Sequence, residues 1–508
     1  MSAATFEERY WYSQGQYWRI ALVIAVALGF FAGMALFVVG WPAAALFGTI
    51  IIGAWLVWQP RQGFYAILAA AIVIEGSSGL PFVATANPMY GGIDDLVGPS
   101  VPFSPLELGM ALLILGTIRQ AGRTNQLRLG EFFWPLLLLS GMVLLGLFRG
   151  MNSGGDGLIG FREIRALLYL LPMYFLTVNL VRERRHFNQL AVVLVLAVSA
   201  MAAGAMWTHL ALVRTGTFRG IIDLGFAHEN AIFAGLLVIF MVAMMVWGKG
   251  FGPRFILVLP GLLALAAILV MKRRVGLIAL DAGLVLLGLV LLRNNWRLFL
   301  VAMPIVMVAA VIYLGIFWNA SGGLGQGARA FRTVIGQEAA TEDLSSKLYR
   351  EREAFNVETN IRWQPFWGSG FGKPYAMPEP LPDLTSFWSM QPYIPHNTIL
   401  WTWMKGGILT FILVLAFFGH ALMRGLALAR RRLEPLLQAW AAVAAASVIM
   451  VFLFAWQDLG LTSLRTLTVF GFCLGLITVI GALPEYEERP TDGQADVGAA
   501  RRSLKAKA

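Results

Sequence analysis

The sequence has few charged residues, and this scarcity defines its broad class. Of 508 residues, 13% are charged and 58% are hydrophobic, whereas roughly 25% of an average soluble domain is charged. An ordinary soluble domain is therefore excluded, and we predict an all-α polytopic membrane protein. No nucleic-acid partner is predicted.

Cysteine is almost absent. Cys473 is the single cysteine and lies in an apolar run, so an intrachain disulfide and a cysteine-based metal cluster are both excluded. His, Cys, Asp and Glu do not gather at metal-ligand spacing in the sequence, so no metal and no cofactor is predicted. A repeat of about 20 to 50 residues is also missing.

Long apolar runs are what the sequence has in abundance. Most are about 17 to 23 residues long, which is enough to span a bilayer, and the run after Ser104 is shorter. Together they predict about 14 transmembrane helices. The first run is kept as a membrane helix because it is longer than a signal-peptide core and lacks a clear cleavage site. The runs cover residues 20–39, 42–58, 63–79, 104–118, 132–148, 164–180, 187–207, 230–247, 255–270, 276–292, 298–318, 396–418, 436–455 and 464–484.

The distribution of Lys and Arg predicts the orientation, because short cytoplasmic loops are enriched in both. Basic clusters such as Arg182/Arg184/Arg185 and Arg430/Arg431/Arg432 fall on one side if both termini are cytoplasmic. The predicted organisation is then eleven helices in 1–318, a large periplasmic loop in 319–395, three helices in 396–484 and a disordered cytoplasmic tail in 485–508.

The loop at 319–395 is long enough to need structure of its own. Thr341 is a suitable N-cap, acids follow it, and no Gly or Pro interrupts the chain to about Ile361. These features predict a helix within the loop. Trp367-Gly-Ser-Gly-Phe-Gly372 then indicates a flexible aromatic turn, and several prolines keep the remainder extended.

Several basic residues lie on the outer side, against the charge bias. Arginine binds phosphate oxygens through a planar fork and keeps its charge at working pH, so the outer arginines predict a shared anion site. They are Arg162 and Arg165 at a helix start, Arg214 and Arg219 in the loop before Asn230, and Arg273 and Arg274 in a tight turn after Lys272.

His396 lies in Pro395-His396-Asn397, where the polar loop meets the apolar run at 396–418. Imidazole titrates near neutrality and can act as a general base, although a histidine at a helix start can equally be a cap. Nearby arginines would disfavour the imidazolium form and keep the base neutral. Asn397 is expected to hold either the helix start or the orientation of the ring.

Two ionisable residues fall within apolar runs, where insertion of a charge is costly. Asp281 is seven residues after Arg274 and so lies two turns along the same helical face, where it could support that arginine. Lys405 is nine residues after His396, on the opposite side of an ideal helix. We therefore expect Lys405 to pair with another helix and take no part in the reaction.

Taken together, these motifs resemble the O-antigen ligase and O-antigen polymerase superfamily. The resemblance rests on Pro395-His396-Asn397 with Gly406 and Gly407, on the aromatic glycine turn before it, on Arg273-Arg274-Val-Gly276 and on Gly225-Phe-Ala-His-Glu-Asn230. It covers roughly residues 255–415, with weaker likeness from about Arg162.

The resemblance implies a metal-independent, inverting transferase of the GT-C-like type in the bacterial inner membrane. Members take a glycan from undecaprenyl pyrophosphate on the periplasmic face and pass it to a glycan or lipid A-core acceptor. It implies that His396 activates or orients the acceptor, and that Arg274 and Arg219 contact the pyrophosphate. Many members carry Ser-Arg where this chain has Arg273-Arg274, so which arginine is equivalent stays open. The role of His228 is also open.

Other functions remain compatible with the sequence. A lipid-linked oligosaccharide flippase would also need many helices and a cationic cavity, but transporters usually show related halves and midplane sites. A structural or docking membrane protein is a third alternative, in which His396 would be replaceable. Within the superfamily, ligase, repeat-unit polymerase and protein O-glycosyltransferase differ in the acceptor, which the residues do not identify.

The orientation can be tested by thiol labelling in a Cys473→Ala background. Single cysteines at Gly323 and Ala340 should react with a membrane-impermeant reagent in intact spheroplasts, because both positions lie in the predicted periplasmic loop. A cysteine at Ala427 should be protected. The reverse labelling pattern would overturn the topology.

Overall fold

The computed structural model describes residues 41–74, 104–124, 126–215, 228–248, 251–271, 273–320, 325–337, 341–385 and 388–483. All regular secondary structure in these residues is helical, which confirms the predicted all-α class. The predicted helix at 20–39 and the predicted tail at 485–508 lie outside them.

The helices follow one another along the whole described chain. In chain order they are α2 (Trp41–Trp58), α3 (Pro60–Val73), α5 (Pro105–Thr124), α6 (Phe133–Asn152), α7 (Gly157–Leu168), α8 (Leu170–Leu180), α9 (Arg184–Thr215), α10 (Asn230–Trp247), α11 (Phe251–Val270), α12 (Arg274–Asn294), α13 (Trp296–Phe317), α14 (Gln326–Val334), α15 (Thr341–Trp363), α16 (Thr398–Gly406), α17 (Ile408–Ala429), α18 (Pro435–Gln457) and α19 (Leu464–Gly481).

Nine segments of the described chain are long and apolar enough to cross a membrane. One of them joins α7 and α8 into a single stretch, Gly157–Leu180, and two shorter apolar helices cover Gly48–Trp58 and Phe255–Val270. The chain is thus a polytopic membrane protein, and the total of about 14 helices stays a prediction.

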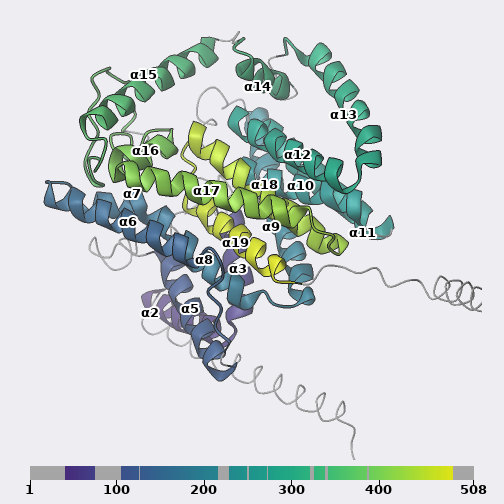
Figure 1. Cartoon of the computed structure of the whole chain (residues 1–508), viewed down its shortest axis with the longest axis horizontal. Helices are drawn as coiled ribbons and strands as arrows, with labels where there is room; N and C mark the ends of the chain where they lie inside the picture. Colours follow the sequence, from purple (N-terminus) through teal and green to yellow (C-terminus); the bar gives the residue numbers. More distant parts are fainter. Residues whose placement is uncertain are drawn as a thin grey trace, which may run out of the picture.

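Helix α18 is central to the bundle. It packs against α10, α12, α17 and α19. Figure 1 shows α15, α14 and α13 along one edge of the molecule, outside this bundle. The predicted helix after Thr341 is confirmed as α15, and it places one long polar helix over the ends of the membrane helices.

The run at 396–418 was predicted as one helix, and this is wrong. Helix α16 ends at Gly406, and Gly407 breaks the run with φ 84° and ψ 176° before α17 begins. A Cβ on Gly407 would lie 2.3 Å from the carbonyl oxygen of Phe366. The two glycines therefore mark a close approach of backbones, and the chain turns between two helices at this point.

The glycine turn at 368–372 is the segment whose backbone lies against the end of α16. Gly368, Gly370 and Gly372 all have positive φ, at 69°, 82° and 85°. The amide of Gly370 donates to the carbonyl of Lys405 at 3.0 Å, and a Cβ on Gly370 would meet the Cα of Gly150 in α6 at 2.4 Å. The turn is therefore packed tightly between α6 and α16, and it is not a loose linker.

A buried ion pair fixes this arrangement. Lys405 Nζ lies 3.3 Å from Glu163 Oε1 of α7, and both side chains are 0% exposed. Glu163 also accepts from the amide of Gly372, and Lys405 also donates to the carbonyl of Lys373. The expectation that Lys405 pairs with another helix is confirmed. The pair joins α7, α16 and the glycine turn.

Breaking this pair should destabilise the protein strongly. Lys405→Met leaves the Glu163 carboxylate buried without its cation, which typically costs about 3 to 5 kcal/mol. Glu163→Gln in the same chain should recover part of that loss, because Gln keeps an acceptor for the Gly372 amide and removes the charge. Thermal unfolding of purified protein in detergent measures both effects. Additive losses in the double variant would show that the two side chains are not coupled.

Candidate active site

A cavity of about 390 Å³ lies between the bundle and the helices at its edge. The start of α12, the end of α18, α14 and α15 each contribute to its wall. Its basic side chains are Arg273, Arg274, Lys347 and Arg350, its acidic side chains are Glu351 and Asp458, and His228 also lines it. The cavity is therefore a place where several cations from distant segments face one volume.

Two of the cations were predicted. Arg273 is the N-cap residue of α12 and Arg274 is its first residue. The Arg274 guanidinium donates from Nη1 to the Thr333 hydroxyl of α14 at 2.7 Å. The start of α12 is thus held against α14, and the first turn of a helix also offers unpaired N–H groups to an anion.

The other two cations, Lys347 and Arg350, come from α15. They are three residues apart and so share one face of the helix. Sequence reasoning assigned α15 only a structural role and missed them. The same three-residue step leads to Glu353, and this spacing was the signal that could have identified the face.

His396 is held by Glu353. Its Nδ1 lies 3.1 Å from each carboxylate oxygen, and its backbone amide donates to Glu353 Oε2 at 3.0 Å. Because an ionised carboxylate only accepts, Nδ1 carries the proton and Nε2 is left as the basic nitrogen. Nε2 has no hydrogen-bond partner among the described residues. The rings of Tyr349 and Trp388 pack edge-on at 5.6 and 5.9 Å.

The surroundings of His396 differ from the expectation. Burial lowers the pKa of its imidazole, but the hydrogen bond and charge of Glu353, with the charge of Asp458, outweigh burial and raise the pKa above the usual value. Arg350 opposes this only weakly. The prediction that nearby arginines keep the His396 imidazole neutral is wrong, because the carboxylates of Glu353 and Asp458 outweigh Arg350.

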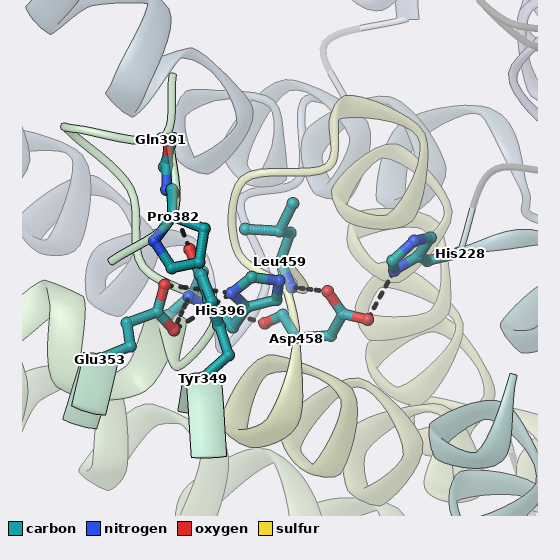
Figure 2. A network of polar contacts seen from close by, with 9 residues as sticks. His228, Tyr349, Glu353, Pro382, Gln391, His396, Asp458 and Leu459 are labelled. Atoms are coloured by element: carbon teal, nitrogen blue, oxygen red, sulfur yellow. Dashed lines mark hydrogen bonds and ion pairs between the residues drawn. The ribbon is translucent and has the colours of Figure 1, made fainter. Parts of the chain in front are cut away.

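Asp458 completes the row of polar side chains. Its Oδ2 lies 2.6 Å from His228 Nδ1, and its Oδ1 accepts from the amide of Leu459 at 2.9 Å. Figure 2 shows His396 lying between Glu353 and Asp458, with His228 beyond the aspartate. Burial raises the pKa of Asp458, yet His228, His396 and Arg350 together hold it below the usual range. The aspartate is therefore ionised, and His228 has a defined partner.

Asn397 holds the start of a helix, which is one of the two roles expected for it. Its Oδ1 accepts from the amide of Leu400 at 2.9 Å and caps α16. The ring of His396 is oriented by Glu353 instead. Thr398 donates to the backbone carbonyls of Ala455 and Asp458 at 2.9 and 3.2 Å, so the start of α16 is fixed to the end of α18.

His396 lies beside Asp458 and is not itself among the residues that line the cavity, and neither are the remaining predicted residues. Arg165 is buried and forms an ion pair with Glu107 of α5, and Arg162 is exposed on α7. Asp281 is exposed on α12. Arg214 is in α9 but its side chain lies outside the described residues, as does Arg219 entirely. Of the predicted anion-binding residues, the structure brings together Arg273 and Arg274.

Comparison with known families identifies the segment that carries most of this site. Residues 259–415 match the family described as O-antigen ligase. The matched segment is less than half of the chain, and it is similar to that family. The match confirms the predicted resemblance to the O-antigen ligase and polymerase superfamily over roughly 255–415. A search of curated proteins gave no match.

The matched segment contains Arg273, Arg274, α15 and His396, whereas His228 and Asp458 lie outside it in sequence. Helices α10 and α18 bring these two residues to the cavity. The site is therefore completed by parts of the chain on both sides of the matched segment.

The role of Glu353 can be tested through the pH profile. If neutral His396 is the base, activity falls as the pH drops through its pKa. Glu353→Gln removes the group that raises this pKa, so the acid limb should move to lower pH and turnover should drop, because the ring loses its orientation. Glu358→Gln is the matched control on the same helix, where the side chain is exposed and pairs only with Arg362. An unshifted acid limb in Glu353→Gln would contradict the assignment.

Proposed function

We propose that this protein is a glycosyltransferase that moves a glycan from undecaprenyl pyrophosphate to an acceptor hydroxyl at the periplasmic face of the inner membrane. The observation that carries the proposal is one juxtaposition within a membrane protein that has a segment similar to the O-antigen ligase family. A cavity with four basic side chains adjoins a histidine held by a carboxylate.

The proposed reaction is a single displacement with inversion. The acceptor oxygen attacks the anomeric carbon, and the bond from that carbon to the pyrophosphate oxygen breaks. His396 Nε2 takes the proton of the acceptor hydroxyl, and Glu353 stabilises the imidazolium that forms. The pyrophosphate leaves with the bonding electron pair, so its negative charge grows in the transition state and cations near it lower the barrier.

The cavity supplies such cations from two directions. Arg273 and Arg274 lie at the start of α12, and Lys347 and Arg350 lie on α15. Arginine can bind two phosphate oxygens at once, while lysine acts as a point charge. We assign the pyrophosphate to the space between these two elements. Arg219 stays a proposed further contact.

The position of the cavity favours a transferase over a flippase. It lies at the first residues of α12 and the last residues of α18, which are both membrane-spanning helices. Transporters usually bind their substrate near the midplane, between related halves of the chain. A site at the ends of the helices suits a reaction at the membrane surface. In a purified detergent assay, formation of a glycosidic bond separates the two functions, because a flippase forms none.

The acceptor distinguishes a ligase from a polymerase. A deletion strain that loses all capped lipid A would indicate a ligase, whereas one that retains single-repeat product would indicate a polymerase. Transfer to protein would leave both glycan profiles unchanged.

Arg274→Lys should reduce kcat/KM for transfer by about 10- to 100-fold. A lysine keeps the charge but loses the forked contact, and hydrogen bonds to charged groups contribute roughly 1.5 to 3 kcal/mol. Arg350→Gln should lower the rate by a similar factor. A purified assay with a lipid-pyrophosphate donor measures both.

Arg362→Lys is the control for these two variants, because Arg362 is 79% exposed at the far end of α15. Its rate should match that of the unchanged protein. Full activity of both Arg274→Lys and Arg350→Gln would remove the argument for pyrophosphate binding in this cavity.

A further inference from the structure

A second basic cavity lies at the other end of the bundle. Its volume is about 830 Å³. Helices α10, α12 and α18 contribute to it, together with Asn295 after α12 and the connection between α17 and α18. Arg293, Arg430, Arg431 and Arg432 line it. No acidic side chain is among the described residues that line it.

The distance between the two cavities follows from α12. Arg274 at its first residue lines the candidate active site, and Arg293 in its last turn lines the second cavity. A helix rises 1.5 Å per residue, so these residues are separated by about 30 Å, the thickness of the hydrocarbon core. Helix α18 also reaches both cavities, at Gln438 and at Phe454. The two cavities therefore lie at opposite membrane surfaces.

The carboxylate closest in sequence to the residues that line this cavity is that of Glu434, and it pairs with a residue outside the cavity. Glu434 lies between Leu433 and Pro435, which both line the cavity. Its carboxylate pairs with Arg184 of α9. Arg431 is fixed at the cavity wall by hydrogen bonds to the carbonyls of Gly481 and Leu483, at 2.8 and 2.9 Å. Glu434 is thus engaged with α9, and Arg431 is held at the wall of the cavity.

The walls also match the depth of lipid headgroups. Trp247 lines the cavity at the end of α10, and the adjacent Trp296 is 57% exposed at the start of α13. Tryptophan is enriched at this boundary between hydrocarbon and water. Asn294, Asn295 and Gln438 add amide groups to the same wall. Basic pockets between membrane helices recognise phosphate-bearing lipid headgroups.

We propose that this cavity binds the phosphate headgroup of an anionic phospholipid in the leaflet opposite the candidate active site. The ordinary enrichment of arginine in short loops explains charge on this surface. It does not require that arginines from two separate segments, the last turn of α12 and the connection after α17, surround one cavity. This lipid cannot be the glycan donor, because it lies across the membrane from His396.

The proposal is tested by lipid binding to the purified full-length chain in detergent. Native mass spectrometry should detect phosphatidylglycerol bound more tightly than phosphatidylcholine. Arg293→Gln, Arg430→Gln and Arg432→Gln should each weaken phosphatidylglycerol binding by roughly fivefold, the effect of about 1 kcal/mol per basic residue near an anionic lipid. The triple variant should lose on the order of 100-fold if it folds, and the single variants decide the matter if it does not.

Arg297→Gln is the matched control. Arg297 is four residues after Arg293 but lies in the first turn of α13, and it does not line the cavity. Its guanidinium lies 5.8 Å from the Trp296 ring. Phosphatidylglycerol binding should be unchanged in this variant. If Arg297→Gln weakens phosphatidylglycerol binding as much as the cavity variants do, the lipid is attracted to the whole basic surface, and the proposed site is overturned. Competition by inorganic phosphate at the same concentration as the lipid would point to a soluble anion and overturn the lipid assignment.

Discussion

The buried ion pair between Lys405 and Glu163 is the constraint on which the arrangement of the domain depends. Two charges withdrawn from water are costly, and the cost is offset only where each has further hydrogen bonds. Here the further partners are backbone groups of the glycine turn, at Gly372 and Lys373. The pair therefore fixes α7, α16 and the turn in one geometry. Helix α16 carries this geometry to its other end, where His396 begins the site.

The second organising element is α15, which lies outside the membrane bundle. One face of this helix supplies Lys347 and Arg350 to the cavity and Glu353 to His396. Its other polar residues hold the extended segment that follows, since Asn356 exchanges two 2.8 Å hydrogen bonds with the backbone of Glu379. A loop between two membrane helices thus contributes both basic side chains to the cavity and the carboxylate that holds His396.

Much of this protein was accessible from local sequence. Composition and apolar runs determined the helical membrane class, because each span satisfies its own backbone hydrogen bonds. Thr341, a candidate N-cap, and the run without Gly or Pro after it predicted α15, which begins at Thr341 itself. His396 and the Arg273-Arg274 turn were identified because they stand at boundaries between polar loops and apolar runs. Each of these signals lies within a few residues of the feature that it predicts.

The tertiary structure alone decided which side chains meet. Glu353 reaches His396 across 43 residues, and His228 reaches Asp458 across 230. It also pairs Arg165 with Glu107, away from the residues that line the cavity. The break at Gly407 depends equally on the distant backbone of Phe366. Sequence patterns specify the faces of individual helices, whereas pairing between buried polar groups depends on how those helices pack, and no local pattern encodes that.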